Sequence, residues 1–298
     1  MRLFFWQRLR RHAGLVVALV PVIGFFFCAA FAPLVSPSSP TKISAAIFSA
    51  PSVSHWLGTD NLGRDELSRI IWGSRYTLLS ALVSVLLAAA VGSVLGALSA
   101  FSGRLANALI MRLTDVGLAF PALMLAFVLI AVLGTGFWAV SLTVGIALTP
   151  VFIRLVATAS DECVQADHMF VARVLGYSRL RRLFRHLLPN VAPVILVLTT
   201  SAFGWAILII SGLDYLGLGV PLPTPSWGGD LSVGETYLTQ AWWLSVAPGA
   251  AITIVVLCTN YLGDLVGERL GVNRGRVRSG VMMGSVSTGT DVSLDFEV

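Results

Sequence analysis

Charged residues are scarce in this chain of 298 residues. Only 12% of them are Asp, Glu, Lys or Arg, whereas 56% are hydrophobic. A soluble domain carries about 25% charged residues, so the composition excludes an ordinary water-soluble globular protein. The formal net charge of +5 does not indicate nucleic-acid binding, because the arginines gather at the ends of apolar segments, where they set the orientation of membrane helices.

Disulfide and metal frameworks are lacking as well. The cysteines are Cys28, Cys163 and Cys258, two inside apolar runs and one in a polar loop. No metal-type spacing links them and no paired pattern suggests disulfides, so we interpret them as free thiols and predict no metal site.

The motifs of several other functional classes are missing. There is no G-x-x-x-x-G-K-[ST] segment, so the chain itself is not expected to bind ATP. No H-E-x-x-H or G-x-S-x-G segment and no convergent histidines mark a membrane-embedded enzyme, and no catalytic residue is predicted. Asp115, Asp214 and Asp264 lie near the ends of apolar runs, whereas self-powered secondary transporters place charges at the membrane midplane. A membrane-embedded enzyme and a secondary transporter therefore remain alternatives, and the missing motifs and midplane charges disfavour both.

Long apolar runs, by contrast, are abundant. Six segments of about 20 residues each are long enough to cross the hydrocarbon core of a bilayer. They must be helical, because lipid offers no hydrogen-bond partner to the backbone. The expected spans are 13–35, 78–100, 105–133, 137–157, 191–213 and 243–262. The sequence therefore predicts an all-α polytopic membrane protein.

The arginines predict that both chain ends face the cytoplasm. With six spans, four arginine-rich regions fall on one side of the membrane, and cytoplasmic segments carry the excess of positive charge. These arginines are Arg2, Arg8, Arg10, Arg11, Arg104, Arg112, Arg154, Arg173, Arg179, Arg181, Arg182, Arg185, Arg269, Arg274, Arg276 and Arg278. The opposite segment 213–242 contains no Lys or Arg.

The chain divides into four parts on this basis. Residues 1–50 comprise a cytoplasmic tip, the first span and the start of an outer segment, and residues 51–77 complete that outer segment. Residues 78–270 form a core of five spans with a cytoplasmic loop at 158–190, and the polar tail 271–298 has the composition of a disordered segment.

The cytoplasmic loop is the largest polar insert between apolar spans. Its sequence from 166 to 190 is ADHMFVARVLGYSRLRRLFRHLLPN. We expect an amphipathic helix, a break at Gly176, which tolerates backbone angles closed to other residues, and a second helix that stops at Leu188-Pro189. The residues expected to lie together on the first helix are Met169, Val171, Ala172, Val174 and Leu175. The loop either docks a soluble partner or lies on anionic lipid headgroups.

The outer segment contains a second motif, HWLGTDNLGRD from His55 to Asp65. Gly58 and Gly63 permit tight turns, and its aspartates can cap helices or pair with Arg64 and Arg69. Two interpretations stay open: direct contact with a solute at the outer mouth, or a structural brace between the first two spans. The candidate residues are Gly58, Thr59, Asp60, Gly63, Arg64 and Asp65.

Five collinear stretches together resemble one branch of ABC importer permeases. They are the motif of residues 55–75, Arg112 and Asp115 before Phe120-Pro121, Gly176 followed by Leu188-Pro189, the 215–228 segment YLGLGVPLPTPSWG, and Asn260 with Leu262-Gly263-Asp264. The branch is the second permease of dipeptide, oligopeptide and nickel importers, the DppC/OppC-like family. The stretches cover the chain from about residue 50 to residue 270 in the family's order.

The resemblance implies that the cytoplasmic loop couples this chain to an ATPase. The residues matched to the coupling pattern are Phe170, Val171, Ala172, Arg173, Leu175, Gly176, Leu188 and Pro189. Phe170 stands where the family has Glu, Val171 where it has Ala and His186 where it has Ile. Because Phe170 weakens a possible salt bridge to the ATPase, we expect apolar packing to be the main coupling contact. A carboxylate common in the fifth span of the family is also absent: Ile209 and Ile210 occupy that region, and Asp214 follows.

The same resemblance implies the rest of the assembly. It predicts the type I importer permease fold in a bacterial inner membrane, a second homologous permease, two ABC ATPase subunits that use ATP and Mg, an extracytoplasmic solute-binding protein and surrounding membrane lipid. It implies no cofactor on this chain and no nucleic-acid partner. Di- or oligopeptides are the expected solutes, with nickel or a metallophore as the alternative.

Overall fold

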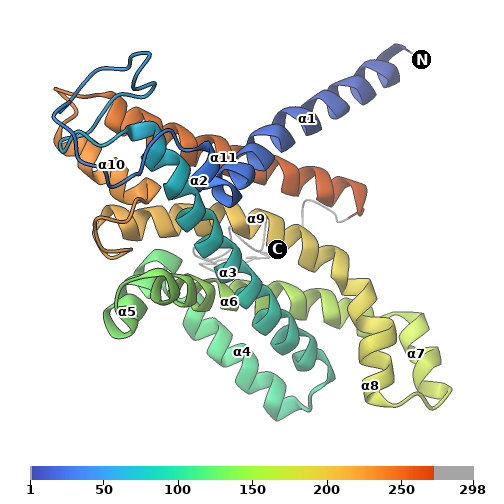
Figure 1. Cartoon of the computed structure of the whole chain (residues 1–298). Helices are drawn as coiled ribbons and strands as arrows, with labels where there is room; N and C mark the ends of the chain where they lie inside the picture. The colour runs from blue at the N-terminus through green and yellow to red at the C-terminus, as the bar shows by residue number, and fades with distance from the viewer. Residues whose placement is uncertain (1, 272–298) are drawn as a thin grey trace, which may run out of the picture.

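The computed structural model describes residues 2–271, with side chains from residue 14 onward. Over that range the chain forms a bundle of α-helices (Figure 1), and its isolated β-bridge joins Thr59 to Asp65. The all-α class expected from the sequence is confirmed. The C-terminal tail, apart from its first residue, lies outside the described residues, as do the side chains of the first four arginines.

The helices follow the expected order. Their bounds are α1 Arg2–Ala30, α2 Ala32–Val35, α3 Glu66–Phe101, α4 Arg104–Leu118, α5 Ala122–Leu133, α6 Phe137–Gln165, α7 Asp167–Val174, α8 Arg179–Arg182, the π-helix η1 Leu183–Leu187, α9 Leu188–Tyr215, α10 Trp227–Thr236 and α11 Trp243–Arg269. Four of the six expected apolar segments lie within single helices, whereas 13–35 is interrupted at Phe31 and 105–133 at residues 119–121. Among the described residues, four helices are each long and apolar enough to cross a membrane, and the number is five if the bent pair α4–α5 is counted as one span. The apolar part of α1, Gly14–Ala30, is shorter.

The third expected span, 105–133, is not one straight helix. It is bent by 94° between α4 and α5, at residues 119–121. Pro121 explains the break, because proline lacks the N–H that would continue the helix and its ring clashes with the preceding turn. Proline also disfavours helical angles at the residue before it, here Phe120.

The expected stop at Leu188-Pro189 is wrong. The chain from Arg179 to Tyr215 forms one helical run of 37 residues that passes through η1 into α9. Pro189 is tolerated because it lies in the first turn of α9, directly after the wider π-turn, where a missing N–H costs little. The side-chain amide of Asn190 donates to the carbonyl of His186 at 2.6 Å and satisfies one acceptor in this transition.

The packing of α3 against α6 forms the centre of the bundle and depends on glycines. A Cβ at Gly96 would lie 2.8 Å from the carbonyl oxygen of Ile153, and one at Gly145 would lie 2.7 Å from Leu87 Cδ2. Ser84 Oγ donates across the same contact to the carbonyl of Ser141 at 2.9 Å. Small residues allow such close approach in membranes, where van der Waals contact replaces the hydrophobic driving force.

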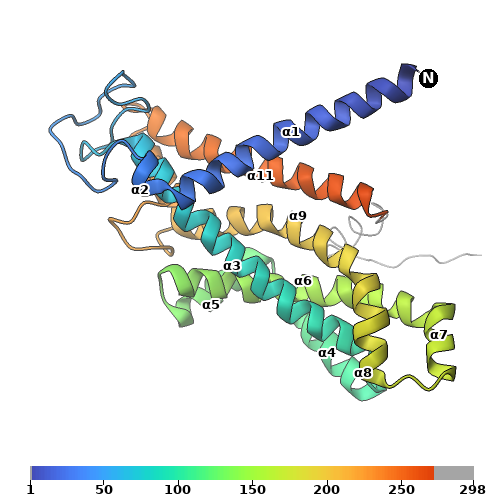
Figure 2. The same ribbon diagram turned by 45° about the vertical axis from the view of Figure 1, so that its right-hand side comes forward.

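The two ends of the bundle carry different structures. Both views place the irregular segment before α3 together with α10 at one end, and α7 and α8 at the other (Figures 1 and 2). The arginine distribution assigns the first end to the outer side and the second to the cytoplasm.

Replacing Gly96 by Leu should separate α3 from α6. We expect a loss of about 1–3 kcal/mol in stability, typical of overpacking a well-packed site. Thermal unfolding in detergent, followed by size-exclusion chromatography, measures this effect. Gly24→Leu is the matched control, because a Cβ at this exposed helical position meets no atom within 4 Å. Equal stability of the two variants would contradict the assigned packing.

Candidate functional site

The cytoplasmic loop folds as two short helices joined by a tight turn at Gly176. Gly176 has φ +75°, a left-handed conformation that glycine adopts without steric cost. The turn is closed by the N–H of Tyr177, which donates to the carbonyl of Ala172 at 3.1 Å. Ser178 then caps α8 by accepting from the N–H of Arg181 at 3.3 Å.

The two faces of α7 differ from the expected grouping. Met169 and Ala172 are buried against the bundle, whereas Val171, Val174 and Leu175 point away from it, so the single face expected for these five residues is wrong. The helical period is the reason, because positions i and i+3 or i+4 share a face and neighbours do not. The exposed set, which we call the α7 apolar surface, is Phe170 (63% exposed), Val171 (52%), Val174 (70%) and Leu175 (65%).

The remaining loop residues anchor this surface to the bundle. Leu187 in η1 is fully buried and Leu188 is half-buried, whereas Arg173 and Pro189 are exposed. Exposed apolar patches rimmed by polar residues mark sites of protein or membrane contact. The α7 apolar surface is therefore suited to a partner, and its buried neighbours would carry force into the helix bundle.

The outer motif forms a compact turn before α3. Gly58 and Gly63 have φ values of +76° and +70°. A Cβ at Gly58 would lie 2.6 Å from Trp243 Nε1, and one at Gly63 would collide with the carbonyl of Ser44. Thr59 Oγ1 accepts from the N–H of Ser49 at 2.8 Å and donates to the carbonyl of Ala46.

Both motif aspartates bind groups of their own segment. Asp60 accepts from the N–H of Leu62 at 2.9 Å and from the N–H and Nε of Arg64 at 2.8 and 2.6 Å. Asp65 caps α3 by accepting from the N–H of Ser68 at 2.9 Å, and its other oxygen lies 3.0 Å from His55 Nδ1. Capping and pairing, both expected from the sequence, are thus present together.

The structure shows that Arg69 has a buried acidic partner, Asp230, which the sequence did not indicate. Arg69 Nε donates to Asp230 on α10 at 3.0 Å, and the same nitrogen lies 3.9 Å from Asp60 Oδ2. Trp227, also on α10, donates from Nε1 to the carbonyl of Ile70 at 3.0 Å. Because 161 residues separate Arg69 from Asp230, no local sequence pattern indicated the pair. The sequence did show an acidic residue, Asp230, in an outer loop without Lys or Arg, and this could have suggested a partner elsewhere in the chain.

We call this cluster the outer brace, because its contacts link the outer segment, α3 and α10. The side chains of Asp60, Arg64, Arg69 and Asp230 are 6% exposed or less, so a solute cannot reach them. Burial raises the pKa of the Asp230 carboxyl above its usual range, although the Arg69 guanidinium opposes this shift. The indole Nε1 of Trp243 on α11 donates to the carbonyl of Thr59 at 3.2 Å. The cluster therefore contacts α10 and α11, whereas the sequence had suggested a link between the first two spans only.

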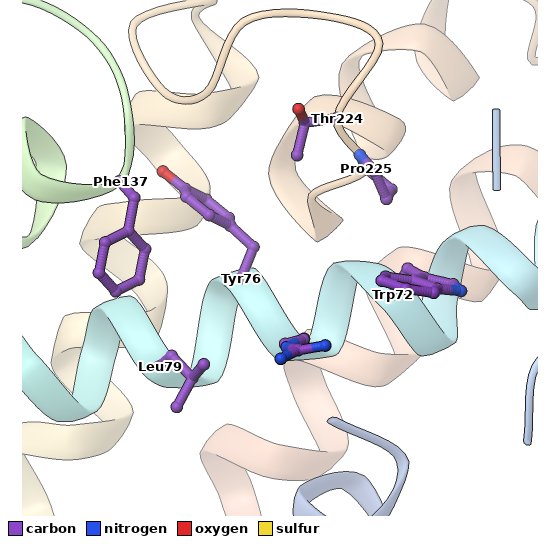
Figure 3. A pocket seen from close by; sticks show the side chains of 7 residues that line it. Trp72, Tyr76, Leu79, Phe137, Thr224 and Pro225 are labelled. Carbon is purple, nitrogen blue, oxygen red and sulfur yellow. The ribbon is translucent and has the colours of Figure 1, made fainter. Parts of the chain in front are cut away.

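A shallow cavity opens beside the brace at the outer end. It measures about 230 Å³ and is lined by Trp72, Arg75, Tyr76, Leu79, Phe137, Thr224 and Pro225. Figure 3 shows Tyr76 of α3 between Phe137 on one side and Thr224 and Pro225 on the other. Tyr76 donates from its hydroxyl to buried Asp214 at 3.5 Å. The walls are mainly apolar, and no solute is assigned to this cavity.

Asp115, one of the acidic residues near the end of an apolar run, forms an ion pair. Asp115 on α4 contacts Arg154 on α6, and both side chains are partly exposed. The pair links the broken third span to the core. Within the described residues, no group of three or more His, Cys, Asp or Glu side chains is placed to hold a metal ion.

Removing one member of the buried pair should be costly. We expect Asp230→Asn to lower stability by about 3–5 kcal/mol, because Arg69 would lose its buried counter-charge. Thermal unfolding and protein abundance in membranes measure the effect. Glu235→Gln on exposed α10 surface is the matched control and should change stability by less than about 0.5 kcal/mol.

A double variant separates the brace from solute binding. Arg69→Met with Asp230→Leu removes both charges and should recover most of the lost stability, as apolar replacement of buried ion pairs often does. A normally stable Asp230→Asn protein that fails to transport would instead indicate contact with the solute.

Comparison with known proteins places these features in context. Residues 92–272 match the family described as binding-protein-dependent transport system inner membrane component, and residues 3–51 match the N-terminal TM domain of oligopeptide transport permease C. The chain is 38% identical over 267 residues to the di/tripeptide transport system permease protein DppC of Pseudomonas aeruginosa, covering 87% of this chain and 88% of that protein. It is 35% identical over 260 residues to the dipeptide transport system permease protein DppC of Alkalihalophilus pseudofirmus, covering 87% and 86%.

A solved structure gives a similar fold. A chain of the MetNI methionine ABC transporter in an inward-facing conformation aligns with a TM-score of 0.56 and 15% identity, covering 68% of this chain and 96% of that chain. At this identity the likeness concerns the fold alone.

Proposed function

This chain belongs to the family of binding-protein-dependent transport system inner membrane components. On that premise we propose that it is one permease subunit of an importer that carries di- or oligopeptides across the cytoplasmic membrane. It is a multi-pass inner-membrane subunit of an ABC importer and not an enzyme. The observation that carries the peptide assignment is the 38% identity to a di/tripeptide permease over 87% of the chain.

A permease of this class works with ATPase and solute-binding partners. We extend this to a full assembly of one second homologous permease, two ABC ATPase subunits and one extracytoplasmic binding protein. ATP and Mg are used by the ATPases, and this chain contributes no nucleotide-binding loop to them.

The α7 apolar surface is the proposed contact with an ATPase. Phe170, which stands where the family pattern has Glu, is 63% exposed and forms part of an otherwise aliphatic patch. The contact at this position would therefore come from burial of apolar area instead of from a salt bridge. Arg173 in the last turn of α7 lies at the rim of this surface.

The connection from the loop into the membrane is helical and continuous. Met169 and Ala172 bind α7 to the bundle, and the 37-residue run from Arg179 to Tyr215 passes through η1 into α9. A rigid helix transmits displacement along its length without bending at a loop. Closure of the ATPases would move α7 and α8, and α9 would carry this movement towards the outer end.

The outer brace would make the receiving end of this movement rigid. The buried pair Arg69–Asp230 holds the start of α3 against α10, and Trp243 ties α11 to the same segment. Because these contacts hold α3, α10 and α11 together, the outer end would move as a unit. A displacement at the cytoplasmic end would then open or close the outer end of the transport pathway in one step.

Transport by the reconstituted importer tests the peptide assignment. The assembly in proteoliposomes, supplied with ATP and its binding protein, should accumulate labelled di- or oligopeptides. Nickel chelates are the competing solute class and should neither accumulate nor displace the peptide. Uptake of nickel chelates without peptide uptake would overturn the assignment while leaving the permease role intact.

A charge placed on the α7 apolar surface should uncouple the importer. Phe170→Asp forces a carboxylate into an apolar contact, and we expect at least about a tenfold loss of ATPase association, equivalent to about 1.4 kcal/mol. Co-purification of the ATPases and solute-stimulated ATP hydrolysis measure it. Phe184→Asp is the control, because Phe184 on η1 has a matched exposure of 65%. Equal losses in both variants would reject α7 as the docking site.

A further inference from the structure

A second cleft lies at the cytoplasmic end, between the α3–α4 turn and α8. It measures about 370 Å³. Figure 2 shows α8 beside the junction of α3 and α4. Its lining residues are Leu98, Phe101, Ser102, Gly103, Ala106, Arg179, Leu180 and Leu183. The cleft is separate from the α7 apolar surface, which none of these residues forms.

Two guanidinium groups stand at this cleft without a counter-charge. Arg179 lines it directly, and Arg182 lies with its Cζ 5.7 Å from the ring centre of Phe101, which is also a lining residue. Within the described residues, neither arginine forms an ion pair. The Nε of Arg182 is moreover buried without a hydrogen-bond acceptor, so this donor lacks the partner that a buried polar atom normally has.

The rest of the cleft is mainly apolar and continues onto exposed apolar side chains. Leu98 and Leu180 line the cleft and remain 40% and 68% exposed, and Leu105 at the start of α4 is 88% exposed. α3 ends at Phe101, and the arginine distribution assigns this end of the helix to the cytoplasmic side. An occupant therefore meets positive charge at one end and hydrocarbon-like walls at the other.

We propose that this cleft binds an anionic phospholipid of the cytoplasmic leaflet. The phosphate would lie between Arg179 and Arg182, because guanidinium groups bind phosphate oxygens with paired N–H donors. An acyl chain would cover Leu98, Leu180 and Leu183. The negative surface potential of the leaflet concentrates such lipids next to arginine-rich segments. Free phosphate shares the polar chemistry but leaves the apolar walls uncovered.

The bound lipid would act as a wedge between two moving parts. α8 leads without interruption through η1 into α9, whereas the opposite wall belongs to α3 and α4. A lipid that contacts both walls fixes the position of α8, and through it the position of the neighbouring turn at Gly176. This predicts that anionic lipid alters coupling as well as binding to the chain.

Native mass spectrometry of the full chain, with any subunits that co-purify from mixed phosphatidylcholine and phosphatidylglycerol nanodiscs, tests the proposal. Wild-type chain should retain phosphatidylglycerol in preference to phosphatidylcholine. The double variant Arg179→Gln/Arg182→Gln should retain roughly ten- to a hundredfold less, the effect of losing a hydrogen bond to a charged group. Ala106→Phe fills the cleft without changing charge and should also displace the lipid.

The matched control is Arg181→Gln/Arg185→Gln, which removes the same charge from the same segment. Neither residue lines the cleft, and the guanidinium of Arg181 lies over the ring of Tyr177, whereas that of Arg182 lies over the lining residue Phe101. Its phosphatidylglycerol retention should equal that of the wild type. Equal losses in both double variants would overturn the site in favour of a diffuse surface charge. Displacement of phosphatidylglycerol by inorganic phosphate would assign the arginines to a free anion. An effect of the Arg179/Arg182 variant on ATPase association, with lipid retention unchanged, would assign them to a protein contact.

Discussion

The absence of water from the hydrocarbon core is the constraint on which the whole structure depends. Every backbone N–H and C=O group there must find a partner within the chain, so the spans are helices. Lipid also removes the hydrophobic driving force between helices, and close contact replaces it. Gly96 and Gly145 allow α3 and α6 to approach each other at the centre of the bundle. The bend at Pro121 breaks the third span where α4 and α5 lie at the edge of this core.

Charge is used in opposite ways at the two ends. At the outer end, Arg69 and Asp230 are buried, paired and linked to a motif whose glycines permit close turns. Buried charges of this kind need their partners and hold two parts of the chain in one arrangement. At the cytoplasmic end, Arg179 and Arg182 have no carboxylate partner within the described residues. The charged groups at the outer end therefore satisfy one another, whereas the cytoplasmic end exposes apolar side chains and arginines that are free to meet a partner.

The helical run through η1 extends from the cytoplasmic loop to the outer end, so it would carry the proposed movement between them. A loop that docked a partner but joined the membrane through a flexible segment would lose the displacement before it reached the pore. Here Leu187 is fully buried and Pro189 lies in the first turn of α9, so the loop and the fifth span share one helix. α7 directly precedes this helical run, and α8 at its start forms one wall of the cleft between α3, α4 and α8. α8 would therefore adjoin both proposed partners.

Composition and local pattern alone determined the class of the protein, the apolar segments and the turn at Gly176, because these depend on residues close together in the chain. The family followed from the resemblance of five separate stretches in the same order. The faces of α7 were misassigned because burial depends on which side of the helix meets the bundle, and sequence spacing allows more than one choice. The stop expected at Pro189 failed because the preceding π-turn accommodates proline. The pairing of Arg69 with Asp230 and the cleft between α3, α4 and α8 required the tertiary structure, since their residues meet only when distant segments of the chain pack together.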